Sequence, residues 1–118
     1  MYGKIKCGCG CGLDIDSSIK SIAENIEKEI GQELDITSGA RCPVYNATVK
    51  GAIAGDAHER CKALDVFVDF STPVGRELGG KIITAAVHCG IKRFGIAKSF
   101  LHIDCVAEFP SPRMWLYY

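Results

Sequence analysis

The sequence has no excess of charge of either sign, because fourteen basic residues balance fourteen acidic ones. Non-specific nucleic-acid binding depends on clustered Lys and Arg that displace counterions from phosphates, so this balance argues against it. No apolar run approaches the roughly 18 residues that a membrane-spanning helix needs. The first ten residues also lack the apolar segment of a secretory signal. We therefore expect a soluble protein made in the cytoplasm, with no nucleic-acid or membrane partner.

Histidine is scarce and cysteine is plentiful in this chain of 118 residues, which has three of the first and seven of the second. An odd number of cysteines cannot all pair in intramolecular disulfides, so the sequence leaves the redox compartment open. The length suits one hydrophobic core and leaves no room for a second catalytic domain. We expect a single domain over residues 1–118, and a monomer.

Apolar spacing predicts two helices. Residues 16–30 place Ile and Ala on one helical face, with Asp16 or Ser17 as a cap and Gly31 as a stop. Residues 72–90 repeat the pattern, and Pro73 is well placed in a first helical turn. Each helix has an apolar side that needs a partner, so we expect both to pack on a common core.

Alternating apolar and polar residues predict strands, because successive side chains of a strand point to opposite faces. We expect strands at 34–37, 63–70, 92–96 and 100–106. An irregular stretch at 38–60 separates the first two, and loops of that length in a small domain are more often functional than idle. Helices and strands in this order predict an α+β fold.

Four polar residues are candidates for chemistry: His58, Asp65, His102 and Asp104. A catalytic zinc site keeps three protein ligands and one open position, and imidazole and carboxylate are suitable ligands. His58, Asp65 and His102 would provide them if the two predicted strands were neighbours. Spacing alone favours a polar loop histidine at position 58, and His102 is equally compatible with the solvated side of a strand. His88, near a helix C-terminus, suits the helix dipole and is assigned no function.

Several segments resemble the peptidase M15 family, in particular its small D-alanyl-D-alanine carboxypeptidase-like and phage endolysin-like branch. That family carries S-G-x-R, then S-x-H-x-x-G-x-A-x-D, then x-H-x-D, and the likeness here spans about residues 30–115. The matching segments are TSGARCPVYN (37–46), AHERCKALDV (57–66), FLHIDC (100–105) and PRMW (112–115).

The resemblance implies zinc bound by His58, Asp65 and His102, with Arg41 orienting a substrate carboxylate or a polarised carbonyl oxygen. It implies a compact α+β domain with a small antiparallel sheet, helices packed on one side, and a zinc cleft. The implied activity is hydrolysis of peptidoglycan stem peptides, as a D,D-carboxypeptidase or an endolysin-type endopeptidase. Without a secretory signal, such a protein would reach the cell wall after release, as a phage lysin does. The alternative is a non-catalytic zinc-binding or wall-peptide-binding module that has lost the general base.

The general base is the main departure from the family pattern. Members place Asp or Glu three residues before the last histidine ligand, and this chain has Ser99 there. Asp104 is the first substitute, because residues i and i+2 of a strand share a face. Asp104 could instead orient a ligand histidine, or be a ligand itself while His102 acts as the base. Glu59 and Glu108 are weaker candidates.

Two further positions depart from the pattern: Asp56 stands at its serine and Cys61 at its glycine. The CGCGC segment at 7–11 lacks the C-x2-C pairing of structural zinc sites, so we expect a disulfide to Cys42, or packing, rather than a second metal. A catalytic thiol at Cys61 or Cys105 is the rival chemistry, and nothing in the spacing favours it.

Overall fold

The centre of the fold is a six-stranded sheet. In the computed structural model, which describes residues 1–117, the strand order is β1-β2-β3-β5-β4-β6. The three inner pairs are antiparallel, whereas β1 runs parallel to β2 and β6 parallel to β4. The strands are β1 (Tyr2–Gly3), β2 (Asp35–Ser38), β3 (Ala63–Phe67), β4 (Arg93–Ile96), β5 (Phe100–Asp104) and β6 (Arg113–Leu116).

The expected small antiparallel sheet is therefore wrong in extent and in direction. All four predicted strands are present, but a parallel strand is added at each edge to give a larger, mixed sheet. β1 has two residues and β6 has four, and both are largely exposed, so neither has a buried alternating pattern that would reveal it. The strand predicted over 63–70 is also shorter, since β3 ends at Phe67.

Both predicted helices are confirmed. α1 (Ser17–Ile30) begins after Asp16, whose side chain accepts the N–H of Ser18, and Gly31 ends it with a φ of 74°. α3 (Pro73–His88) begins after Thr72, whose hydroxyl accepts the N–H of Gly75. A third helix, α2 (Pro43–Asn46), interrupts the stretch expected to be irregular.

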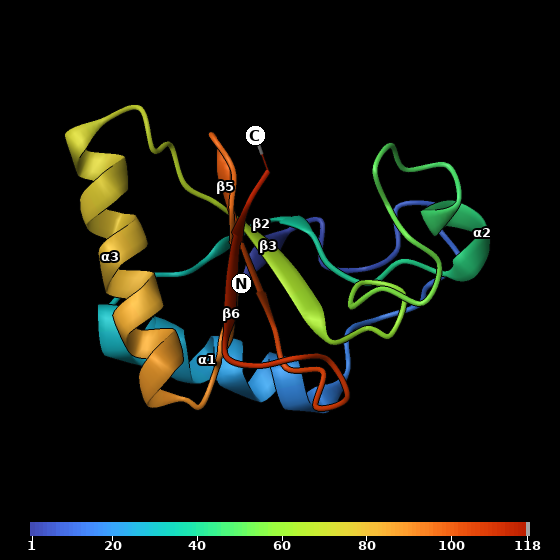
Figure 1. Ribbon diagram of the computed structural model, residues 1–118, viewed down its shortest axis with the longest axis horizontal. Coiled ribbons are helices and arrows are strands. Elements are labelled where there is room, and N and C mark those ends of the chain that lie inside the picture. The colour runs from blue at the N-terminus through green and yellow to red at the C-terminus, as the bar shows by residue number, and fades with distance from the viewer. Residues whose placement is uncertain (118) are drawn as a thin grey trace.

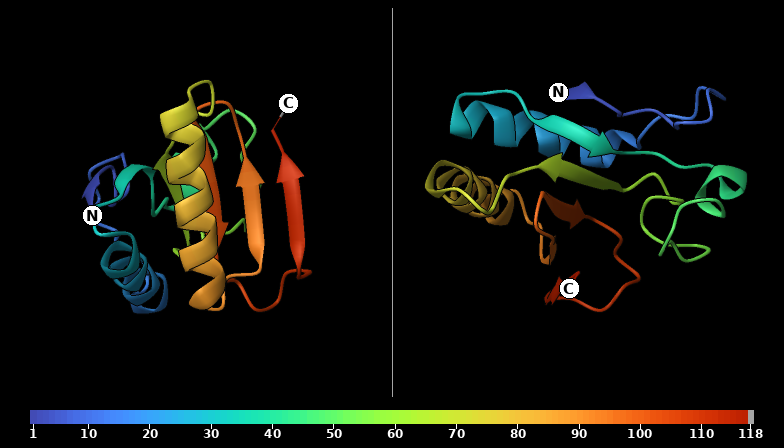
Figure 2. Two further views of the ribbon diagram at one scale, coloured as in Figure 1. Left: turned by 90° about the vertical axis from the view of Figure 1, so that its left-hand side faces the viewer. Right: turned by 90° about the horizontal axis from the view of Figure 1, so that it is seen from above.

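The helices divide between the two faces of the sheet. α1 and α3 pack together and against one face, whereas α2 and the loop that follows it lie on the other (Figure 1, Figure 2). The buried core lies between the sheet and the first two helices, and burial of this apolar surface is the main force that holds the layers together. Its members include Ile19, Ala23 and Ile26 of α1, Ile82, Ala85 and Ala86 of α3, and Leu64, Val66, Leu101 and Ile103 of the sheet.

The molecule has the dimensions of one compact domain. Its radius of gyration is 13.3 Å, about the value expected for a single domain of this length. Among residues 1–117, no helix combines the length and apolar character needed to cross a bilayer.

Candidate metal centre

Two of the candidate ligands lie opposite each other in the sheet. β3 and β5 pair so that Asp65 faces His102. Their neighbours Leu64 and Leu101 are fully buried in the helix-covered core, so alternation directs Asp65 and His102 to the other face. Paired residues of this kind have Cβ atoms about 4.5–5.5 Å apart. Here Nδ1 of His102 lies 2.9 Å from Oδ1 of Asp65.

His58 reaches the same point from the loop before β3. Its carbonyl accepts the backbone N–H groups of Arg41 at 3.1 Å and of Cys61 at 3.0 Å, which joins this loop to the segment that follows β2. Nδ1 of His58 lies 2.7 Å from the carbonyl oxygen of Gly39. A carbonyl can only accept, so Nδ1 carries a proton. In neutral His58, Nε2 then has a free lone pair, and it lies 3.2 Å from Oδ1 of Asp65.

Asp104 holds the remote nitrogen of His102. Nε2 of His102 lies 2.8 Å from Oδ2 of Asp104, which is fully buried. The same carboxylate accepts Nε–H of Arg93 at 2.8 Å and the backbone N–H of Val106 at 3.4 Å. A proton on Nε2 leaves Nδ1 of His102 to face Asp65. Carboxylates that hold the far nitrogen of a ligand histidine are a regular feature of metal sites.

The structure thus brings together His58, Asp65 and His102, which come from distant parts of the sequence. One ligand atom from each lies within 4.8 Å of the other two, and all three residues are buried. Both imidazoles have their other nitrogen held by a fixed acceptor, so each can turn a lone pair toward the same point. These three side chains can hold a metal ion, and two nitrogens with one carboxylate oxygen form a donor set that zinc accepts. We call them the histidine–aspartate centre.

The electrostatics of the centre favour positive charge between its carboxylates. Burial alone would lower the pKa of His102, but hydrogen bonds to Asp104 and Asp65 outweigh burial and raise it to about 9. Burial would raise the pKa of Asp65, yet contacts with His102 and His58 hold it well below its usual range. The pKa of Asp104 is also lowered against the effect of burial, by His102 and by Arg93. Both carboxylates are therefore ionised at neutral pH.

Arg41 lies beside the centre, as the resemblance described above implied. It and the three ligands line a hollow of about 770 Å³ on the sheet face opposite α1 and α3. Nη2 of Arg41 lies 3.8 Å from Oδ2 of Asp65, while Nε donates to Ser38 and Nη1 donates to Asn46. The guanidinium is held in place from two sides and still lines the hollow.

Trp115 is a member of the site to which sequence reasoning gave no role. The sheet register runs Asp65, His102, Gly95, Trp115 across four adjacent strands. Gly95 has no side chain, and a Cβ there would lie 2.5 Å from Nε1 of Trp115. The indole therefore crosses over Gly95 and contacts His102, with ring centroids 5.3 Å apart. Only the pairing of β6 with β4 reveals this contact, and β6 has no recognisable strand pattern.

Arg93 is a second residue that the sequence did not single out. Besides its bond to Asp104, its guanidinium lies 5.0 Å from the Trp115 ring and 5.1 Å from the Phe109 ring. These contacts place a permanent positive charge behind Asp104 and two aromatic rings beside it. A lone arginine in a short strand has no sequence signal for this role.

The other acidic and basic candidates lie outside the centre. Ser99 and Glu108 are exposed. Glu59 accepts the side-chain N–H of Asn46 at 3.1 Å, on the flank of the hollow. His88 is exposed at the end of α3, where its Nδ1 lies 2.9 Å from a carboxylate oxygen of Glu29.

Cys61 stands at the glycine of the motif pattern and has a backbone conformation typical of glycine. Its φ is 61°, the single positive value among the non-glycine residues of the described chain. This left-handed conformation favours glycine, which is the residue of the family pattern at that position. The thiols of Cys61 and Cys105 contact Glu59 and Ser18 respectively, and neither is hydrogen-bonded to an imidazole among residues 1–117.

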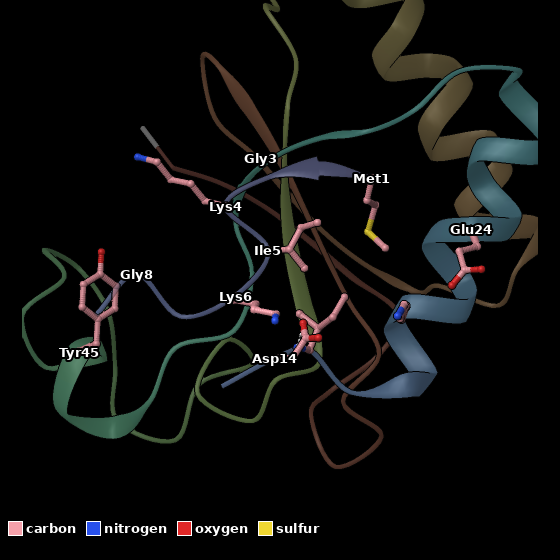
Figure 3. Close-up of a pocket in the computed structure, with 11 residues that line it drawn as sticks. Met1, Gly3, Lys4, Ile5, Lys6, Gly8, Asp14, Glu24 and Tyr45 are labelled. Atoms are coloured by element: carbon pink, nitrogen blue, oxygen red, sulfur yellow. Dashed lines mark hydrogen bonds between the residues drawn. The ribbon is translucent and has the colours of Figure 1, made fainter. Parts of the chain in front are cut away.

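A second, larger hollow of about 960 Å³ lies beside the N-terminal segment (Figure 3). Its labelled side chains include Lys4, Lys6, Asp14 and Glu24, which carry mixed charge. Among the described residues that line it there is no imidazole and no group of converging ligand atoms. The candidate ligand atoms of the histidine–aspartate centre meet in the smaller hollow.

The chain matches no protein-family model, no curated protein and no solved structure.

Proposed function

We propose that the chain is a zinc-dependent peptidase of the peptidase M15 type that hydrolyses peptide bonds of bacterial peptidoglycan. The observation that carries this proposal is the convergence of His58, Asp65 and His102 within 4.8 Å. The motifs that resemble that family place its ligands at these same three positions, which supports the proposal.

Zinc supplies two things in such a site: it lowers the pKa of a bound water to about 7, and it polarises a carbonyl oxygen. The chain must supply the geometry. Gly39 and Asp104 do so by fixing the orientation of the two imidazoles through their remote nitrogens. Preorganised ligands of this kind avoid a reorganisation cost when charge develops during the reaction.

Arg41 is the proposed substrate-orienting group. Its guanidinium lines the hollow and is held by Ser38 and Asn46, so its position does not depend on substrate. A planar guanidinium pairs well with a carboxylate or a developing oxyanion. Stem peptides of peptidoglycan have such carboxylates, which supports this substrate class.

The role of Asp104 determines whether the proposed peptidase has a general base at this position. A peptidase needs a group that takes the proton of the attacking water and passes it to the leaving amine. Asp104 is our candidate, yet its Oδ2 contacts the nitrogen of His102 that faces away from Asp65. That contact supports an orienting role, in which Asp104 acts through His102 and is a positioning residue.

A non-catalytic module is the second candidate function. It is favoured by the exposed Ser99 at the usual acidic position and by the engagement of Asp104 with His102 and Arg93. Such a module would bind zinc and wall peptide through the same residues and would leave the peptide bond intact.

Digestion of purified peptidoglycan tests the two candidates. We expect the zinc-loaded chain to release free amino groups, and a chelator to abolish that release. His58→Ala should abolish it too, whereas His88→Ala should leave it unchanged, because His88 is exposed and pairs with Glu29, away from the centre. Binding to peptidoglycan without release would favour the module. If the chain neither binds peptidoglycan nor releases amino groups, both candidates are contradicted.

A further inference from the structure

A second group of potential ligands lies away from the histidine–aspartate centre, on the loops that surround the N-terminal segment. Four cysteine sulfurs lie within 4.8 Å of one another. Cys7 Sγ is 3.4 Å from Cys9 Sγ, and Cys9 Sγ is 3.7 Å from Cys42 Sγ. We call this group the four-cysteine cluster, and its members are Cys7, Cys9, Cys11 and Cys42.

The cluster is neither a disulfide nor a packed core. A disulfide joins its sulfurs at about 2.05 Å, and the cysteines of the cluster are free at longer separations. Free cysteine is usually a small buried hydrophobe. Cys9 and Cys11 are exposed, so burial of apolar surface does not explain why their sulfurs gather at one point.

Glycine makes this convergence possible. In an extended strand, residues 7 and 11 would be separated by about 13 Å, which is too far for their sulfurs to share one ion. The chain turns instead: Gly10 has a φ of 84° and Gly12 a φ of 86°. Gly8 lies so close to Tyr45 that a Cβ would be 2.6 Å from its hydroxyl oxygen. The alternation of Cys and Gly over residues 7–12 therefore brings three sulfurs to one side of a tight loop.

The distances suit one tetrahedral ion. Zinc–sulfur bonds of about 2.3 Å in a tetrahedron place neighbouring sulfurs about 3.8 Å apart, close to the separations of the cluster. Backbone N–H groups also point at the sulfurs: Cys42 donates to Sγ of Cys7 at 3.3 Å, and Tyr45 donates to Sγ of Cys42 at 3.4 Å. Such donors stabilise the negative charge of thiolate ligands.

We propose that the four-cysteine cluster binds one zinc ion through four thiolates and acts as a structural site. Four thiolates leave no open position for water, which distinguishes it from a catalytic centre. The proposal does not depend on the peptidase assignment.

The bound ion would fasten the N-terminal segment to the loop that holds the histidine–aspartate centre. The carbonyl of Ile5 accepts the N–H of Ala40 at 2.9 Å, and a Cβ on Gly39 would lie 2.1 Å from that oxygen. Gly39 in turn accepts Nδ1–H of His58. A metal at the cluster therefore stabilises the backbone that orients His58 and carries Arg41.

Cobalt substitution tests the proposal on the unaltered chain. Purified protein is stripped of metal under reducing conditions and titrated with Co²⁺ alone. We expect thiolate-to-cobalt charge-transfer absorption in the near ultraviolet, which imidazole and carboxylate ligands do not produce. His58→Ala should keep this absorption, and displacement of Co²⁺ by Zn²⁺ should remove it.

The double variant Cys9→Ser/Cys11→Ser should lose the absorption and bind about one zinc ion fewer per chain than the unaltered protein. Both cysteines are exposed, so the fold should persist, and circular dichroism checks this. Cys89→Ser is the matched control and should behave like the unaltered chain. Absent charge-transfer absorption in the unaltered chain would overturn the proposal, as would zinc content that the double variant leaves unchanged.

Discussion

The histidine–aspartate centre and the four-cysteine cluster assemble ligands in different ways. In the centre, two ligands belong to paired strands, and the register between β3 and β5 sets their distance. In the cluster, no ligand belongs to a strand, and positive-φ glycines together with the N-cap position of α2 bring the sulfurs together. The centre is buried and contains nitrogen and oxygen, whereas the cluster is largely exposed and contains only sulfur.

A site built on a sheet and a site built on loops suit different tasks. A site built on a sheet has ligands that are positioned by the rest of the fold, so it can leave one coordination position open for chemistry. A site built on loops has few other contacts to hold it, and the metal itself supplies the stability. The two sites meet at residues 39–42, where one loop carries the acceptor for His58, then Arg41, then a cysteine of the cluster.

Removing a ligand of the centre should have the largest effect. His58→Ala is expected to lower zinc affinity at the centre by more than about 100-fold, since loss of a group that only orients a ligand already costs about 10–100-fold. Metal analysis should show the cluster still loaded. Equal loss of metal from both sites would break the comparison, because it would mean that they do not bind independently.

Asp104 separates orientation from proton transfer. In Asp104→Asn the amide oxygen can still accept Nε2–H of His102, so an orienting role predicts retained metal and a modest fall in turnover. Asp104→Ala removes the acceptor and should lower zinc affinity about 10–100-fold. If Asp104 is the base, Asp104→Asn keeps metal and loses most turnover. Paired measurements of bound zinc and amine release on both variants distinguish the roles.

The pH dependence of zinc affinity should differ between the sites. His102 has a raised pKa of about 9, so at neutral pH it must lose a proton before Nδ1 can bind metal. Affinity at the centre should then rise roughly tenfold per pH unit up to about pH 9 and flatten above it. The cluster would bind metal through four thiolates, and each thiol that is still protonated must lose a proton, so its slope should be steeper.

Isothermal titrations over pH measure these slopes separately. Cys9→Ser/Cys11→Ser reports on the centre alone, and His58→Ala reports on the cluster. A centre whose affinity does not change between pH 7 and pH 9 would show that His102 carries no proton to displace.

Two glycine substitutions should produce the smallest effects and act on opposite sites. Gly95→Ala forces a Cβ against Trp115, and overpacking of this kind costs about 1–3 kcal/mol. Gly10→Ala meets no neighbouring atom within 4 Å, but its φ of 84° costs about 1–2 kcal/mol in a residue with a side chain. Chemical unfolding with zinc bound should show both losses. Gly95→Ala should weaken the centre, and Gly10→Ala should weaken the cluster.

Much of the fold was predictable because its signals are local. The Ile and Ala spacing of α1, the caps Asp16 and Thr72, and the alternation in β3 and β5 all act within a few residues. The edge strands were not predictable, because β1 and β6 are short and mostly exposed and form through pairing with β2 and β4. These two edge strands are also the parallel ones, so the mixed character of the sheet was not predictable either.

The three candidate ligands were predictable from the sequence, whereas the contacts that surround them were not. Alternation alone places Asp65 and His102 on the face opposite the core, and the motifs include His58 and Arg41. The contacts around the ligands come from groups to which sequence reasoning gave no role: the carbonyl of Gly39, the guanidinium of Arg93 and the indole of Trp115. For the cysteines, the preference for a disulfide or packing over a metal came from spacing, which assumes that neighbours along the chain determine ligand geometry.

By itself the sequence determined which side chains share a face, where the helices begin and end, and which residues are chemically able to bind a metal. Only the tertiary structure decided that Asp65 lies opposite His102, that His58 faces them, and that Cys42 joins three cysteines from the N-terminal loop. Periodicity and caps are properties of a few consecutive residues. Contacts between residues that are distant in the sequence depend on strand register and loop closure. Both follow from how the whole chain buries its apolar surface.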